Sequence, residues 1–150
     1  TAGLTKGIIR LAQEKVRFNL AISLHTANDT KRNALMPVNK SNPLPELAKS
    51  LTLFHQETGT RISYEYLLMK DFNDSLRDAR ELAEFCKITP CKINLIEYNE
   101  VSGSLHQKTT PERMQAFVDF LYSRNMIVNI RRIRGQDIDA ACGQLASKSG

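Results

Sequence analysis

The chain has 150 residues, a formal net charge of +5, 41% hydrophobic residues and 25% charged residues. These values are typical of a single globular domain over 1–150 and exclude a disordered chain. No run of about 18 apolar residues is present, so we expect no membrane span, and we expect no signal peptide. The chain begins at Thr1 without a Met, which we interpret as a trimmed or excised fragment. The moderate positive charge permits an anionic partner such as RNA without requiring one.

The three cysteines, Cys86, Cys91 and Cys142, are odd in number and widely spaced. This pattern argues against a disulfide framework and indicates a reducing compartment, so we expect a cytoplasmic protein. There is no CxxC pair and no zinc-type spacing of histidines, and we therefore predict no metal site in this chain.

Strands and helices are predicted to alternate along the chain. Hydrophobic periodicity predicts strands over 16–25, 61–69, 91–99 and 127–134, helices over 44–59, 74–88 and 109–125, and a short helix from Asp137. Gly59 is a plausible helix stop, Ser75 with Asp78 a plausible cap, and Thr110 before Pro111 a plausible helix start. Repeated strand–helix–strand units predict a parallel α/β sheet, either open or part of a barrel.

The first predicted strand has two different faces. Leu20, Ile22 and Leu24 alternate with small or polar residues, which are Asn19, Ala21, Ser23 and His25. The small, polar face is unusual for a closed barrel core and predicts a lumen that holds ligand or water. Ligands of parallel α/β proteins collect at the carboxyl ends of the strands, where His25, Asn99 and the Arg134–Gly135 turn are expected.

The segments "LAISLH", "CKINLIEYN" and "RRIRGQDIDAACGQL", in this order, resemble the RlmN family of radical S-adenosylmethionine (SAM) enzymes. The resemblance covers essentially the whole chain. It implies an α/β fold, namely the C-terminal half of a partial (β/α) barrel of the radical SAM type. It also implies methylation of C2 of adenine in 23S rRNA and tRNA, while the related Cfr enzymes act on C8.

The same resemblance implies roles for individual residues. Ser23, Leu24, His25 and Asn99 would contact SAM, and Cys142 would accept a methyl group from one SAM molecule. A radical derived from a second SAM at a [4Fe–4S] cluster would then activate the methylated cysteine for attack on the adenine.

This sequence departs from the family pattern in its missing parts. The cluster-binding CxxxCxxC motif is absent, so the cluster ligands are not in this chain, and Cys86 and Cys91 are too few to replace them. The loop after the third predicted strand reads "NEVSGS" over 99–104 where the family commonly has "NPF.G", so the loop that follows Asn99 departs from the family pattern. We therefore expect the fragment alone to be inactive and to self-associate through an exposed sheet edge.

Plainer interpretations remain open for the candidate residues. Cys142 has Ile138 and Leu145 at helical spacing, so it could be a core thiol. Ser23 and His25 could be polar strand-end groups, and Asn99 a turn residue.

Charged residues also have plain interpretations. Glu65 could pair with Arg61 on the same strand face, and Lys31 and Arg32 could lie on an exposed helix face. The arginines at 131, 132 and 134 alternate, which places Arg131 on the face opposite to the other two.

Two other functions compete with RNA methylation. One is a non-catalytic basic α/β module that binds RNA or a partner chain. The other is a self-contained enzyme that uses Cys142 as a nucleophile.

Overall fold

The computed structural model describes residues 1–100 and 102–132 of the chain. In chain order, the elements are α1 (Thr5–Gln13), β1 (Leu20–Ser23), α2 (Asp29–Leu35), α3 (Val38–Ser41), α4 (Leu44–Thr58), β2 (Ile62–Leu68), α5 (Leu76–Phe85), the 3₁₀ helix η1 (Cys86–Ile88), β3 (Cys91–Glu97), α6 (Pro111–Ser123) and β4 (Val128–Arg132). None of the helices in these ranges is long and apolar enough to cross a membrane.

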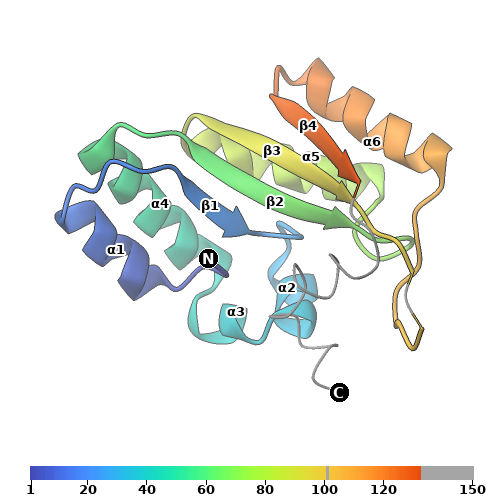
Figure 1. Ribbon diagram of the computed structural model, residues 1–150, viewed down its shortest axis with the longest axis horizontal. Coiled ribbons are helices and arrows are strands. Elements are labelled where there is room, and N and C mark those ends of the chain that lie inside the picture. Colours follow the sequence, from blue (N-terminus) through green and yellow to red (C-terminus); the bar gives the residue numbers. More distant parts are fainter. Residues whose placement is uncertain (101, 133–150) are drawn as a thin grey trace.

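The four strands form one parallel sheet in the order β1-β2-β3-β4 (Figure 1). Each strand pairs with the next strand of the chain, and each connection carries at least one helix. In Figure 1, α5 lies behind the sheet, while α1 and α4 lie together beside β1. The prediction of a parallel α/β arrangement is confirmed, and consecutive βα units of this kind are the building blocks of a partial barrel.

Local signals in the sequence set the helix ends. The Ser75 hydroxyl accepts a hydrogen bond from the Asp78 backbone N–H, and the Asp78 carboxylate accepts one from the Ser75 N–H, which completes a capping box at α5. The Thr110 side chain caps α6, where Pro111 is the first residue. Gly59 ends α4 in a left-handed conformation with φ 71°, which glycine adopts without a steric penalty. The three predicted caps are confirmed.

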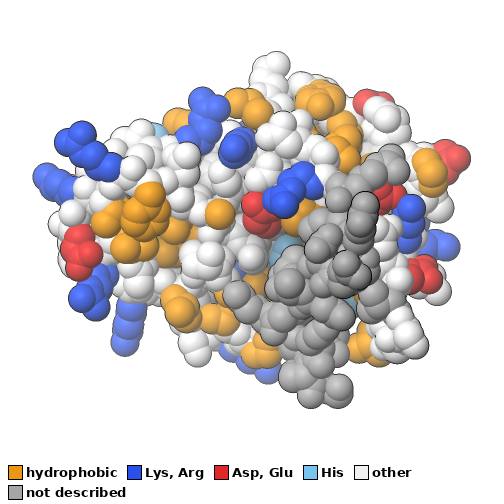
Figure 2. All heavy atoms as spheres, in the orientation of Figure 1, with side chains coloured by type: hydrophobic (Ala, Val, Ile, Leu, Met, Phe, Trp, Pro, Cys, Tyr) orange, Lys and Arg blue, Asp and Glu red, His pale blue; other side chains and the backbone are white. Residues whose placement is uncertain are grey.

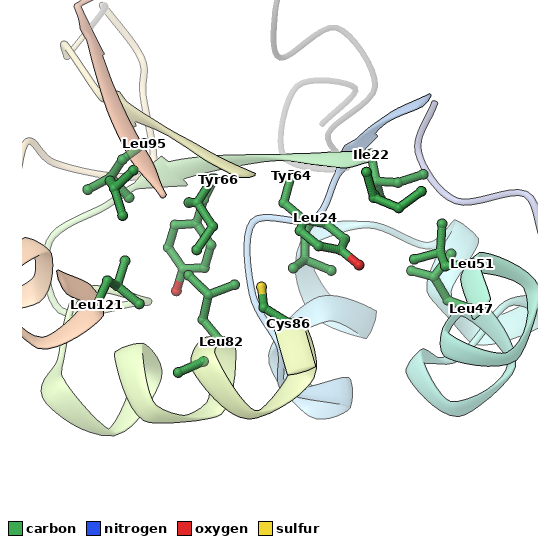
Figure 3. Close-up of a cluster of buried hydrophobic side chains, with 14 of the residues drawn as sticks. Ile22, Leu24, Leu47, Leu51, Tyr64, Tyr66, Leu82, Cys86, Leu95 and Leu121 are labelled. Atoms are coloured by element: carbon green, nitrogen blue, oxygen red, sulfur yellow. The ribbon is translucent and has the colours of Figure 1, made fainter. Parts of the chain in front are cut away.

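The core lies between the sheet and the helices. From the sheet, Ile22, Leu24, Tyr64, Tyr66 and Leu95 point toward the helices, where they meet Leu47, Leu51, Leu82, Cys86 and Leu121 (Figure 3). All of these side chains are buried. Burial of a leucine or isoleucine contributes about 1.5–3 kcal/mol to stability, so this layer dominates the hydrophobic energy of the fold.

The opposite face of the sheet carries polar side chains. In register, Ser23 lies beside Glu65, Glu65 beside Asn94, and Asn94 beside Asn129. We call these four residues the polar row. Toward the carboxyl ends, the same face becomes apolar at Leu67 and Ile96, which join a second cluster with Leu35, Met36, Met69 and Tyr98. The predicted polar face of the first strand is therefore part of a row that crosses all four strands.

Several predicted bounds were wrong. The first strand is short, Leu20–Ser23 instead of 16–25, and the second helix ends at Phe85 before η1. The helices α1 and α3 were not predicted, and α2 was predicted only as a helix face at Lys31 and Arg32, without bounds. The expected helix from Asp137 lies outside the described residues.

Candidate functional site

The predicted ligand-binding residues lie at the carboxyl edge of the sheet. Ser23 is the last residue of β1, and Leu24 and His25 follow it directly. Asn73 follows β2 by a few residues, and Asn99 follows β3 by two. A parallel sheet brings these chain segments to one side of the molecule, because all its strands end at the same edge.

His25 has an unusual position for a strand-end residue. Its backbone is left-handed, with φ 61°, and its side chain is only 4% exposed. The ring Nδ1 accepts a hydrogen bond of 2.9 Å from the Leu67 backbone N–H. Burial, and then the nearby Arg32 charge, lowers the pKa of His25 to about 3. The imidazole is therefore neutral at physiological pH, and its proton lies on Nε2, which is a donor only.

Asn73 joins the ends of β1 and β2. Its amide nitrogen donates to the carbonyl of His25 at 2.6 Å and to the carbonyl of Leu67 at 2.8 Å. Its side-chain oxygen accepts from the Met69 N–H at 2.7 Å, and its own carbonyl accepts from the Tyr66 hydroxyl. Asn73 is fully buried, so its amide is committed to holding the His25 backbone in place.

Arg32 supports the same edge from α2. Its side chain is fully buried, and Nε and Nη2 donate to the carbonyls of Leu24 and Ser23 at 3.1 and 3.0 Å. The remaining donors reach the Ala2 carbonyl at 2.9 Å and the Asn39 amide oxygen at 2.8 Å. Burial lowers the pKa of Arg32 to about 10, so the guanidinium stays charged at neutral pH. The prediction of an exposed helix face was wrong for this residue.

The supporting roles of Asn73 and Arg32 were not predicted from the sequence. An arginine in a polar helical segment is usually exposed, and nothing local indicates that its partners are carbonyls eight and nine residues earlier. For α2, the available signal was the N-cap, because the Asn28 side chain accepts from the Lys31 N–H. Lys31 itself forms an ion pair with the buried Asp78 at 2.7 Å.

Ser23 and Leu24 differ in what they offer a ligand. The Ser23 side chain is half-buried on the polar face of the sheet, next to Glu65 in register. The Leu24 side chain lies wholly in the core, and its N–H donates to the Glu65 carbonyl while its own carbonyl accepts from Arg32. Any ligand contact of Leu24 must therefore use its backbone, whereas Ser23 presents its hydroxyl.

Glu65 is the acidic group of the polar row. One carboxylate oxygen accepts from the Asn94 amide at 3.0 Å, and Asn94 in turn accepts from Asn129 at 3.4 Å. The other oxygen, Oε2, lies 3.6 Å from Arg131 and has no hydrogen-bond partner among the described residues. The interpretation of Glu65 as a carboxylate paired with a basic neighbour agrees with this ion pair, but the neighbour is Arg131 of β4 and not Arg61. Oε2 is thus a buried acceptor on the polar face of the sheet, which is the face that carries the polar row.

Asn99 and Cys142 are the two remaining predicted site residues. Asn99 lies two residues beyond β3, half-buried, and its place at the carboxyl edge agrees with the prediction. Cys142, together with Arg134 and Gly135, lies outside the described residues, so its role stays a prediction. Arg131 lies on the polar face of the sheet, together with Glu65.

The polar face of the sheet carries charged groups of both signs. In the orientation of Figure 1, Figure 2 shows basic side chains spread over the surface, with an acidic and a basic group directly beside each other above the sheet. The pair of Glu65 and Arg131 belongs to this face. Such a surface presents donors and acceptors together, which suits a zwitterionic ligand better than a purely anionic one.

These residues fit SAM but not an iron–sulfur cluster. At the carboxyl edge, the Ser23 hydroxyl and the His25 Nε2–H match the carboxylate and hydroxyl groups of SAM. Glu65 Oε2 lies further back in β2, where it is buried 3.6 Å from Arg131. Within residues 1–100 and 102–132, no group of three or more His, Cys, Asp or Glu side chains could hold a metal ion. Both described cysteines lie at the amino end of β3, at the edge opposite to His25.

Comparisons with known proteins agree with the fold and extend over the whole chain. The chain is 50% identical over 148 residues to a probable dual-specificity RNA methyltransferase RlmN of Cytophaga hutchinsonii, covering 99% of this chain and 40% of that protein. It is 45% identical over 148 residues to the probable RlmN of Flavobacterium psychrophilum, covering 99% of this chain and 43% of that protein. No family model matches the sequence.

Solved structures give the same result. A radical SAM methyltransferase from Sphaerobacter thermophilus superimposes with a TM-score of 0.86 and 39% identity, over 98% of this chain and 43% of the other. A domain of a pyruvate-formate lyase-activating enzyme from Bacteroides vulgatus, at 16% identity and a TM-score of 0.60, shares the fold. The chain spans about two fifths of the length of its curated relatives and belongs, as that part, to the RlmN family.

Proposed function

We propose that this chain is the C-terminal part of a radical SAM methyltransferase that modifies C2 of adenine in 23S rRNA and tRNA. In this proposal, the whole of 1–150 is one structural unit of the enzyme core, and the cluster ligands come from the rest of the protein. The chain alone is inactive, and the complete enzyme works in the cytoplasm. The observation that carries the proposal is the 50% identity to an RlmN protein across nearly the full chain.

The carboxyl edge has the chemistry that SAM binding needs. SAM supplies the methyl group when it is bound, and the residues of this chain orient it. His25 donates through Nε2–H, because its Nδ1 is already held by the Leu67 amide. Ser23 adds a hydroxyl, and Glu65 Oε2 would accept from a ligand amine only where that amine takes the place of Arg131, which lies 3.6 Å away. Arg32 and Asn73 fix the backbone of this segment, so the groups are pre-organised before the ligand arrives.

Cys142 is the proposed methyl acceptor. A thiolate is the nucleophilic form of cysteine, and its ordinary pKa of about 8.5 leaves a few per cent of thiolate at neutral pH. Arg131, Arg132 and Arg134 precede Cys142 in the sequence and supply positive charge to that part of the chain. Arg132 and Arg134, which alternate onto the face opposite to Arg131, would contact RNA phosphates, which position the RNA without selecting the base.

The test of this role uses Cys142→Ser in the complete protein. Serine is similar in size but is a far weaker nucleophile toward SAM. We expect unchanged SAM affinity and a folded protein, with loss of both protein-bound methyl and methyladenine in RNA. Cys91→Ser under reducing conditions is the matched control, since Cys91 lies at the opposite edge, and it should keep activity. Methyladenine formation at a normal rate in Cys142→Ser would refute the proposal.

The SAM contacts are tested separately. In His25→Asn, the Asn oxygen replaces Nδ1 as the acceptor for the Leu67 amide and tolerates the left-handed backbone, but the Nε2–H donor is lost. Loss of one ligand hydrogen bond weakens SAM binding by about 0.5–1.5 kcal/mol, or roughly two- to tenfold. Calorimetry should show this change in His25→Asn, and a larger one when Ser23→Ala is added. Equal SAM affinity in all variants would leave these residues as structural groups only.

A non-catalytic, basic RNA-binding module is the second candidate. The net charge of +5 favours it. It predicts RNA binding that is insensitive to SAM and to Cys142→Ser, with no methyladenine formed by the complete protein.

A further inference from the structure

A pocket of about 250 Å³ lies at the amino ends of the strands, opposite to the candidate SAM site. Arg61 directly precedes β2, Cys91 begins β3, and Ile127 directly precedes β4. The lining is completed by residues of the connecting segments, which are Cys86, Thr89, Pro90, Asn125 and Met126. Two of the three cysteines of the chain therefore line one small pocket that opens to solvent.

The two thiols lie close together. Cys86 is the first residue of η1 and is buried, whereas Cys91 is half-buried. The Cys91 thiol lies 3.8 Å from the Cys86 carbonyl oxygen, to which it donates as a neutral thiol. Only four residues separate the two cysteines, so the short turn from η1 to β3 holds them side by side.

The surroundings make the two thiols chemically unequal. The hydrogen bond from Cys86 and then the Arg61 charge lower the pKa of Cys91, against an opposing effect of burial. The pKa of Cys86 is raised, because it is the donor of that hydrogen bond and is more deeply buried. Cys91 is thus the more nucleophilic sulfur, and Cys86 remains a neutral thiol beside it.

A third group in this pocket region is unsatisfied. The Tyr64 side chain is buried beside both cysteines and Thr89, and its hydroxyl has no hydrogen bond of normal geometry within the described residues. An uncompensated buried hydroxyl is costly, and it can donate to the oxygen of a small polar molecule. Tyr64 does not line the pocket, so the groups that a small oxidant meets there include the two cysteines and Arg61.

We propose that Cys86 and Cys91 are a site of reversible disulfide formation by a small peroxide. The Cys91 thiolate attacks one oxygen of hydrogen peroxide, the O–O bond breaks, and the products are a Cys91 sulfenic acid and hydroxide. The Cys86 sulfur then attacks the Cys91 sulfur and displaces the hydroxyl group, which leaves as water once the Cys86 proton is transferred. The net reaction converts two thiols and one peroxide into one disulfide and two water molecules, so each sulfur loses one electron and peroxide gains two.

Trypsin provides a direct readout, because Lys87 lies between the two cysteines. Cleavage after Arg80, Lys87 and Lys92 places Cys86 in peptide 81–87 and Cys91 in peptide 88–92. The protein is treated with hydrogen peroxide, alkylated and digested without reductant. We expect peptides 81–87 and 88–92 to be joined by a disulfide, and to separate again after treatment with dithiothreitol.

Single variants test the assigned roles. In Cys86→Ser, the sulfenic acid at Cys91 has no resolving thiol, so dimedone should label peptide 88–92 in this variant and not in the wild type. In Cys91→Ser, the buried Cys86 should remain unmodified. Arg61→Gln should slow alkylation of Cys91 at pH 7 by about threefold, because the thiolate loses its nearby positive charge. Circular dichroism of each variant establishes that it is folded.

A matched control separates this site from the other cysteine. Cys142→Ser should leave the link between 81–87 and 88–92 unchanged. The proposal is overturned if the two peptides remain unlinked while Cys91 accumulates sulfenic acid, or if the oxidised link joins either of them to Cys142. It is also overturned if Cys86 is modified as fast as Cys91.

Discussion

Acidification should destabilise the protein chiefly through the buried His25. The pKa of His25 is about 3 in the folded protein because of burial and of the Arg32 charge, whereas an unfolded histidine has a pKa near 6.5. The unfolded state therefore binds a proton that the folded state rejects. The stability that the neutral ring provides is complete above pH 6.5, and it is lost progressively as the pH falls toward 3.

The magnitude follows from the two pKa values. Between pH 7 and pH 5, only the unfolded state takes up the proton on His25, and the free energy of unfolding falls by about 2 kcal/mol. This loss is a sizeable part of the 5–15 kcal/mol that is typical of a domain. Carboxylates titrate mainly below this interval, but burial also lowers the pKa of His106, so the His25 contribution is isolated by comparison with His25→Asn.

Urea unfolding at pH 7 and pH 5 measures the effect. The wild type and His25→Asn are compared, since Asn keeps the hydrogen bond to Leu67 but does not titrate. Between pH 7 and pH 5, we expect the free energy of unfolding to fall by about 2 kcal/mol less in His25→Asn than in the wild type. If both proteins lose stability equally, or if the His25 resonances titrate near pH 6.5 in the folded protein, the assigned burial and hydrogen bonding of His25 are wrong.

Three further predictions concern the fold. Arg32→Leu should reduce the free energy of unfolding by about 3–5 kcal/mol, since it leaves buried carbonyls without their donor, while Arg77→Leu at an exposed position of α5 should change it by less than about 0.5 kcal/mol in urea titrations. Ser75→Ala should cost about 1 kcal/mol in the same assay through loss of the capping box, and a change near zero would contradict the cap geometry. The isolated chain should form dimers or larger oligomers through its edge strands, and sedimentation that shows only monomer at high concentration would contradict this.

The elements that the sequence predicted well are those with local signals. α4, α5 and α6 each combine an apolar stripe with a recognisable cap, so both their existence and one of their ends could be predicted. α1 was missed because Leu4, at its N-cap position, makes no side-chain cap and a glycine interrupts its pattern. α2 and α3 are only seven and four residues long, too short for periodicity to stand out.

The candidate site was predictable in position but not in its supports. The alternation of β1 and the polarity of His25 pointed to the carboxyl edge, and that location agrees with the structure. The buried Arg32 and the pairing of Glu65 with Arg131 depend on contacts between residues far apart in the sequence. Side-chain type alone favours exposure for a charged residue, so only the tertiary structure reveals these partners.

The strict neighbour-to-neighbour order of the sheet also bears on how the chain folds. Leu20 pairs with Ile62, Ile62 with Cys91, and Ile93 with Val128, so the paired residues are 42, 29 and 35 positions apart. Loop-closure entropy favours the pair with the shortest separation, but only by about 0.3 kcal/mol over the longest. The capping box of α5, which lies inside that shortest unit, adds a larger local preference.

We therefore expect the unit β2–α5–β3 to form early in folding, with β1 and β4 added to its two sides. Substitutions in α5 should then slow folding, whereas substitutions in α1 should mainly accelerate unfolding.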